Sequence, residues 1–339
     1  MRLGWSKFRV VGQPALAMAA LLVLAVANPA YADVITYSPV GSGTTYVVTY
    51  DNASIGGNLA NVESAFGYVV NEYQNLFKNV ATINVNVQFG PNVLGESNSR
   101  LLGFTNYATA VSALQSVQAT YGPNANLATA LANLPVNDPT GGGSYVYTSA
   151  EAKALGLSSI SGSDGTITFG NGVAYTFDPN NRQVAGAFDF IGVAEHELSE
   201  VMGRIPILGT NFGGPTISYD INDLYRFTAP GVRSLNPNDT GVYLSLNNGA
   251  TILTGFNPNN GGDVDDYGGS VGSLATDPYN AFASPGQGHA ITSADIANMN
   301  AIGWINTTQT PVPGALVLAM TGLASFGTFG WLTRRRKND

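Results

Sequence analysis

Two adjoining segments with different hydrophobic periods most constrain the fold of this 339-residue chain. In residues 61–79, apolar side chains recur every three or four positions, which predicts an amphipathic helix. In residues 83–89, apolar and polar side chains alternate, which predicts a half-buried strand. The apolar positions are Val62, Phe66, Val69, Tyr73, Leu76 and Phe77 in the first segment and Ile83, Val85, Val87 and Phe89 in the second. Together the two segments predict a mixed α+β fold.

Further elements are expected on both sides of this pair. The pattern of residues 44–50 predicts a strand, and that of residues 108–120 a second helix. Residues 166–169 and 173–177 flank a Gly-Asn-Gly turn, which predicts a β-hairpin.

Loops are expected where Gly, Asn and Asp are frequent, at residues 141–143, 257–262 and 263–269. We therefore expect one α+β domain with a mixed sheet. Its N-terminal part would be residues 33–190. Its C-terminal part, residues 191–308, would hold an active-site helix and many loops.

The chain contains no cysteine and only two histidines, His196 and His289. The absence of cysteine excludes disulfides, thiolate zinc sites, iron–sulfur clusters and thiol catalysis. Two histidines also exclude a site built from many imidazoles. Charged residues make up 11% of the chain and hydrophobic ones 44%, a composition unlike that of highly charged disordered proteins.

The formal net charge of −8 understates how acidic the central part is. Residues 33–310 hold 7 basic and 21 acidic residues, and the other basic residues gather at the two ends. Such a body repels polyanions, so nucleic acid is not expected as a partner.

The first 32 residues have the three parts of a secretory signal peptide. Three basic residues within the first nine positions precede an apolar run at residues 15–27, and Ala-Tyr-Ala at 30–32 supplies small residues for cleavage. The run is too short to span the ~30 Å hydrocarbon core of a bilayer. We expect export, with cleavage by signal peptidase before Asp33.

Residues 311–337 have the layout of a C-terminal sorting signal. Pro-Val-Pro at 311–313 opens an apolar stretch that reaches residue 332, and a basic cluster follows at residues 334–337. This resembles the PEP-CTERM sorting signal of Gram-negative bacteria, which implies processing by an exosortase-type peptidase at the cell envelope after transient membrane insertion. A plain transmembrane anchor is the alternative, because the stretch is long enough to cross a bilayer.

The segment of residues 188–205 carries the chemistry of the chain. His196 and Glu200 are four residues apart, so on a helix they project from one face. Glu197 follows His196 directly, and Gly203 is placed to end the helix.

A histidine at position i, a glutamate at i+1 and a second ligand at i+4 form the arrangement found in zincins. The two ligands hold the metal, which lowers the pKa of its water toward ~7, and the glutamate takes the proton of that water. Here the second ligand is Glu200 instead of a histidine. Zinc accepts carboxylate oxygen, so the exchange is chemically possible.

The third ligand has to come from further along the chain. Asp223 is favoured slightly over Asp220, because the Leu-Tyr-Arg-Phe segment that follows it would pack and fix its direction. His289 is a further alternative. The spacing alone does not decide among the three.

Three stretches, residues 194–204, 223–233 and 294–304, resemble a family of exported bacterial zincin-like metalloproteases that end in PEP-CTERM tails. The last stretch also resembles the closing helix of matrix-type metalloproteases. The resemblance implies a zincin-like fold, a zinc cofactor and a protein or peptide substrate. It further implies that Glu197 is the general base and that His196 and Glu200 are metal ligands.

Simpler interpretations of the same residues remain. Glu195 and Glu200 fit a solvated acidic helix face, and His196 fits a buried histidine satisfied by a carboxylate. Arg204 and Arg226 could stabilise an oxyanion, but salt bridges to nearby acidic residues such as Glu195, Glu200 or Asp223 are favoured.

The loop of residues 263–266, Asp-Val-Asp-Asp, could bind calcium through its oxygens. It lacks the spacing of an EF-hand, so a solvated turn is favoured.

The sequence therefore predicts a secreted or cell-envelope zinc endopeptidase of a Gram-negative bacterium, in which Glu197 activates the attacking water. The alternative is a catalytically inactive zincin-like surface or extracellular-matrix protein. In that case Glu200 and Asp223 would be structural partners of His196 or Arg226.

Overall fold

The computed structural model describes residues 3–4, 32–212, 216–269, 271–272 and 274–306. Most of the expected signal peptide and all of the expected sorting signal lie outside these residues. Within the described part of the chain, no helix combines the length and apolar character needed to span a bilayer.

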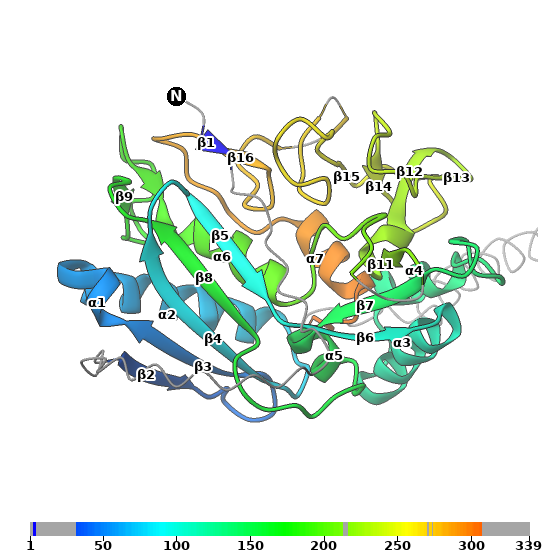
Figure 1. Cartoon of the computed structure of the whole chain (residues 1–339), viewed down its shortest axis with the longest axis horizontal. Helices are drawn as coiled ribbons and strands as arrows, with labels where there is room; N and C mark the ends of the chain where they lie inside the picture. Colours follow the sequence, from blue (N-terminus) through cyan, green and yellow to red (C-terminus); the bar gives the residue numbers. More distant parts are fainter. Residues whose placement is uncertain (1–2, 5–31, 213–215, 270, 273, 307–339) are drawn as a thin grey trace, which may run out of the picture.

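A five-stranded mixed sheet with the order β2-β3-β4-β8-β5 forms the first half of the fold (Figure 1). The three inner strands are parallel to one another, and each edge strand is antiparallel to its neighbour. In spatial order the strands are Ala32–Tyr37 (β2), Thr45–Asp51 (β3), Thr82–Gly90 (β4), Gly165–Gly170 (β8) and Gly95–Ser99 (β5). The strands expected at residues 44–50 and 83–89 are confirmed as β3 and β4.

Alternation along β4 gives the sheet one apolar face and one polar face. Ile83, Val85 and Val87 are buried in the core. The polar residues between them lie on the other face, where Gln88 donates a hydrogen bond to Thr168 Oγ1 across to β8 at 3.0 Å. One face of the sheet is therefore free to be covered by helices.

The helix expected at residues 61–79 is confirmed as α2 (Leu59–Leu76). It connects β3 to the parallel strand β4 and packs on the sheet with its apolar stripe, which is buried. α6 (Phe190–Val201) contacts α2 as well as β5 and β8, so the two helices lie on the same face of the sheet (Figure 1).

The remaining helices flank this layer or lie in the second half of the chain. The helix expected at residues 108–120 is confirmed as α3. The other helices among the described residues are α1 (Asn52–Ile55), the 3₁₀ turn η1 (Gly56–Asn58), α3 (Tyr107–Tyr121), α4 (Ala125–Ala132), α5 (Ser149–Ala154), the 3₁₀ turn η2 (Asn222–Tyr225) and α7 (Ser293–Ala301).

Short strands make four small sheets beside the main one. One has the order β11 (Ser218–Tyr219), β7 (Ser144–Thr148), β6 (Leu101–Thr105). A second has the order β13 (Val232–Arg233), β12 (Arg226–Ala229), β14 (Tyr243–Leu244), β15 (Thr254–Gly255). The other two are pairs, β9 (Tyr175–Thr176) with β10 (Phe188–Asp189) and β1 (Leu3–Gly4) with β16 (Phe282–Ala283). The loops expected at residues 141–143, 257–262 and 263–269 are loops.

The hairpin expected at residues 166–177 is wrong. Both edges of β8 are already occupied, by β4 on one side and β5 on the other, so the following segment cannot pair with it. Tyr175 instead packs its ring against Phe169 and Phe190, and β9 pairs in parallel with β10 just before α6. The mixed α+β class is confirmed.

Candidate metal centre

α6 is buried along its whole length, and β5, α2 and β8 all pack against it. The residues of β5 that face the helix are small: Gly95, Ser97 and Ser99 are all buried. A Cβ atom at Gly95 would lie 2.3 Å from Glu197 Oε1, a distance that real structures do not tolerate. Small side chains on the edge strand therefore let the helix carry its polar residues directly against the sheet.

Three side chains converge at the middle of α6. His196 Nε2 lies 3.1 Å from Glu200 Oε1 and 3.2 Å from Asp266 Oδ1. The helix supplies His196 and Glu200, as their four-residue spacing predicts, and the loop after β15 supplies Asp266. Ligand atoms of the three residues all lie within 4.8 Å of one another, so this group could hold a metal ion.

Neighbouring groups fix the direction of each member. His196 Nδ1 lies 2.8 Å from the carbonyl oxygen of Pro278, to which it donates, so Nε2 is turned toward the carboxylates. Ser97 Oγ donates to Glu200 Oε2 at 2.7 Å. Arg204 Nη1 donates to Asp266 Oδ1 at 2.6 Å.

Arg204 is itself held on three sides. Its Nε donates to Ser199 Oγ at 2.8 Å, and its guanidinium lies over the Tyr279 ring at 4.5 Å from the ring centroid. Its Nη2 lies 3.7 Å from Glu200 Oε1. The arginine thereby positions Asp266 and adds a positive charge behind the two carboxylates.

Glu197 stands one residue after His196 and is 1% exposed. Its Oε1 has no hydrogen-bond partner among the described residues. Burial raises the pKa of Glu197 well above its ordinary value, and the negative charge of Glu200 raises it further. A carboxylate with a raised pKa accepts a proton more readily near neutral pH, as a general base must.

The charges of the cluster are tightly coupled. Burial alone would lower the pKa of His196, but Asp266 and Glu200 outweigh it and raise that pKa to about 10. Burial would raise the pKa of Asp266, but His196 and Arg204 lower it instead. The site therefore places the carboxyl groups of Glu200 and Asp266 beside an imidazole and a guanidinium in a volume that solvent hardly reaches, since Glu200 is only 4% exposed.

The donor set fits a divalent metal of the zinc type. One imidazole nitrogen and two carboxylate oxygens are ligands that zinc accepts. Bonds of ~2.0–2.1 Å in a tetrahedron place ligand atoms about 3.3 Å apart, close to the separations of 3.1 and 3.2 Å found here. Asp266 Oδ2 has no hydrogen-bond partner within the described part of the chain, so one oxygen of this buried carboxylate is left for a ligand.

The third member of the cluster differs from the sequence expectation. Asp223 and Asp220 form a separate buried cluster with Asp265, and neither joins His196 and Glu200. His289 lies beside Asp189 at the start of α6, where its Nδ1 is 3.7 Å from Asp189 Oδ2.

Sequence reasoning missed Asp266 because the loop of residues 263–266 was expected to be a solvated turn. That expectation is wrong: Asp265 and Asp266 are both 0% exposed. The signal that could have found them is the pair of adjacent aspartates in a chain with only seven basic residues in its body, two of which, Arg204 and Arg226, are buried.

The salt-bridge interpretation of the arginines is confirmed, although the main partners differ from those expected. Arg204 pairs most closely with Asp266 and more distantly with Glu200, and Arg226 Nη1 lies 2.7 Å from Asp265 Oδ1. Glu195 does not lie on a solvated face, because it is buried and lies 3.3 Å from Arg182.

A cleft of about 550 Å³ opens beside the cluster. Asp263 belongs to its wall, and burial together with the charges of Asp266 and Glu200 raises the pKa of Asp263 to about 9. Asp263 thus lines the cleft and is close enough to Asp266 and Glu200 to interact with them electrostatically. The other lining residues are Pro206, Leu208, Gly209, Thr210, Phe212, Pro237, Asn259, Gly261, Gly262 and Val264.

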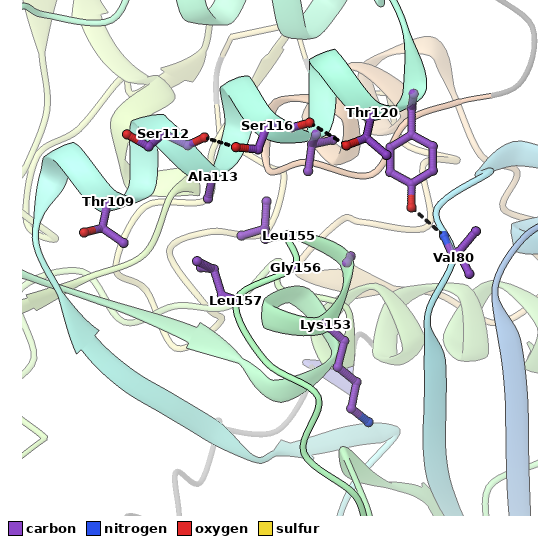
Figure 2. A pocket seen from close by; sticks show the side chains of 13 residues that line it. Val80, Thr109, Ser112, Ala113, Ser116, Thr120, Lys153, Leu155, Gly156 and Leu157 are labelled. Carbon is purple, nitrogen blue, oxygen red and sulfur yellow. Dashed lines mark hydrogen bonds between the residues drawn. The ribbon is translucent and has the colours of Figure 1, made fainter.

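A second hollow, of about 400 Å³, lies between α3 and the end of α5 (Figure 2). Ser112, Ser116 and Thr120 of α3 border it, and the hydroxyls of Ser116 and Thr120 are bonded back to their own helix. Lys153 reaches away to Asp164 at 2.7 Å. Among its described lining residues, this hollow brings together no group of His, Asp and Glu side chains like that on α6.

Comparison with known proteins gave no matching family model and no significant match to a curated protein or to a solved structure.

Proposed function

We propose that this chain is an exported, metal-dependent peptidase with a zincin-like active site. The observation that carries the proposal is the convergence of His196, Glu200 and Asp266, with Glu197 next to His196 on α6. His196, Glu200 and Asp266 would hold a zinc ion, and Glu197 would be the general base. The export signal and the envelope location expected from the two chain ends are part of the same proposal.

A zinc ion held there would supply a Lewis acid, polarising the scissile carbonyl and lowering the pKa of the attacking water. Glu197 takes one proton from that water while the water oxygen bonds to the peptide carbonyl carbon. Glu197 then gives the proton to the leaving nitrogen as the C–N bond breaks.

The edge position of β5 supports a peptide as substrate. Among the described residues β5 is an edge strand that pairs with β8, and an edge strand is where an extended peptide can add to a sheet. Ser97, in the middle of this strand, bonds directly to Glu200. A peptide along β5 would therefore pass the cluster on α6.

The second candidate function is a non-catalytic surface or matrix protein, and one observation favours it. Arg204 and His196 already neutralise Asp266 and Glu200 through contacts of 2.6–3.7 Å. A network of this kind can hold a fold together without a metal. The two candidates differ in whether zinc binds and whether Glu197 matters.

The test is metal content and hydrolysis measured on the same preparations. Wild type supplemented with zinc should hold about one equivalent by elemental analysis and should cleave peptides from a mixed library. Glu197→Gln should keep the metal and lose hydrolysis by about 10²–10⁴-fold. Glu96→Gln, on the opposite face of β5, is the matched control and should change neither. A wild type that takes up no zinc, or a Glu197→Gln variant with full hydrolysis, would contradict the proposal.

A further inference from the structure

A second cluster of carboxylates includes Asp265, the residue next to Asp266 in the same loop. Carboxylate oxygens of Asp220, Asp223 and Asp265 lie within 4.8 Å of one another. All three residues are 0% exposed. Like charges so close and so deeply buried repel one another strongly unless something neutralises them.

The backbone holds two of these residues in fixed directions. The amide of Asp220 donates to Asp223 Oδ2 at 3.0 Å, and the amide of Asp223 donates to Asp220 Oδ1 at 2.8 Å. Asp265 Oδ1 accepts from Arg226 Nη1 at 2.7 Å. Each carboxylate is thus anchored through one oxygen.

The other oxygen of each carboxylate lacks a partner. Asp220 Oδ2, Asp223 Oδ1 and Asp265 Oδ2 make no hydrogen bond within the described residues. A buried carboxylate oxygen without a hydrogen-bond partner is costly, and native proteins rarely leave three in one place.

A fourth buried carboxylate approaches from a different element. Glu151, on α5, is 0% exposed, and neither of its carboxylate oxygens has a hydrogen-bond partner among the described residues. It is close enough to Asp220 to interact with it electrostatically. Arg226 forms a salt bridge with Asp265 and is the one arginine or lysine paired with this cluster within the described residues, so acidic groups outnumber basic ones here.

We propose that Asp220, Asp223 and Asp265 bind a divalent cation through their unpartnered oxygens, and that this cation is calcium. The donors are all oxygen, which selects a hard cation over zinc or copper. Three carboxylates can supply several of the six to eight oxygens that calcium takes.

The position of Asp265 gives this site a structural role. Asp265 belongs to the second cluster, and its neighbour Asp266 belongs to the cluster on α6. A cation at the second cluster would fix the backbone at Asp265 and with it the position of Asp266. The calcium site stands on its own residues, so it holds whether or not the chain is a peptidase.

Terbium luminescence and thermal unfolding test the proposal on the full chain after treatment with a chelator. Tyr219 is adjacent to Asp220, and its ring centroid is 6.4 Å from that of Tyr145, so excitation of these tyrosines should sensitise bound Tb³⁺. We expect Tb³⁺ emission that added Ca²⁺ displaces. Saturating Ca²⁺ should also raise the melting temperature by about 5 °C or more.

Variants assign the signal to this cluster. Asp223→Asn and Asp265→Asn should each lose the emission and the calcium shift. Asp239→Asn, a loop aspartate bonded to Ser234 and Asn236, is the matched control and should keep both. His196→Ala and Glu200→Gln should keep the calcium response while losing zinc, which separates this site from the proposed active site.

Two results would overturn the inference. One is a chelated wild type that shows neither Tb³⁺ emission nor a calcium-dependent melting temperature; this result does not depend on any variant folding. The other is an Asp223→Asn variant that melts higher than wild type in calcium, because relief of charge repulsion would then outweigh any lost ligand.

Discussion

Asp266 Oδ1 lies 3.2 Å from His196 Nε2, although the two residues come from a loop and a helix that are far apart in the sequence. This contact, and not one from Asp223, completes the cluster on α6. Arg204 fixes the same Asp266 oxygen from the opposite side at 2.6 Å.

Removal of Asp266 should therefore affect zinc far more than removal of Asp223. We expect Asp266→Asn to lower zinc affinity by more than about 100-fold, because a ligand is lost. Asp223→Asn should lower it by less than about tenfold, because its carboxylate lies in the other cluster. Titration calorimetry with zinc measures both. Equal losses in the two variants would mean that Asp223 contacts the metal after all.

Ser97 should matter for metal binding although it is not a ligand. Its hydroxyl donates to Glu200 Oε2 at 2.7 Å and so holds the carboxylate in place. We expect Ser97→Ala to lower zinc affinity by about 10–100-fold without unfolding the protein. Ser99→Ala is the matched control, since the hydroxyl of Ser99 donates to the backbone oxygen of Glu200, at 3.5 Å, and not to its carboxylate. The prediction fails if a competition assay with a zinc chelator ranks the two variants together.

Gly95 should be intolerant of any side chain. A methyl group there would meet Glu197 Oε1 at 2.3 Å and Val193 Cγ1 at 2.7 Å. We expect Gly95→Ala to cost about 1–3 kcal/mol of stability and to reduce hydrolysis by displacing Glu197. Gly57→Ala, where nothing lies within 4 Å, should do neither. Urea unfolding and peptide hydrolysis together check this, and wild-type values for Gly95→Ala would show that β5 is not packed against Glu197.

Asp189 should make stability depend on pH at the acidic end. Burial would raise its pKa, but hydrogen bonds from His289 and Arg182 lower it below the ordinary value of 3.8. A lowered folded-state pKa gives stability that is present above the unfolded value and is lost as pH falls through the folded value. Asp189→Asn should cost about 1–3 kcal/mol at pH 7.

The difference in unfolding free energy between wild type and Asp189→Asn should then become smaller as pH falls below 3.8. Thermal unfolding of both proteins, measured at a series of pH values from 7 downward, tests this expectation. Asp178→Asn, an exposed position, should show no such gap at any pH. A gap that widened on acidification would have the wrong sign for a lowered pKa.

Much of the fold follows from local patterns in the sequence. The periods of residues 61–79 and 83–89 predicted α2 and β4, because burial of one helix stripe or one strand face leaves its mark on neighbouring positions. The hairpin after residue 166 could not be predicted in the same way. Whether β8 had a free edge depended on β4 and β5, which local sequence does not reveal.

The candidate site likewise has a part that the sequence predicts and a part that depends on the tertiary structure. The four-residue spacing of His196 and Glu200, with Glu197 between them, determined by itself that these three side chains would lie on the same side of one helix, since helix geometry is local. Only the tertiary structure decided that Asp266 joins them and that Asp220 and Asp223 meet Asp265 instead. The reason is physical, because the side chains of a loop follow no periodic pattern that would predict their directions. Contacts with Arg204 and Arg226 orient Asp266 and Asp265 toward two different clusters.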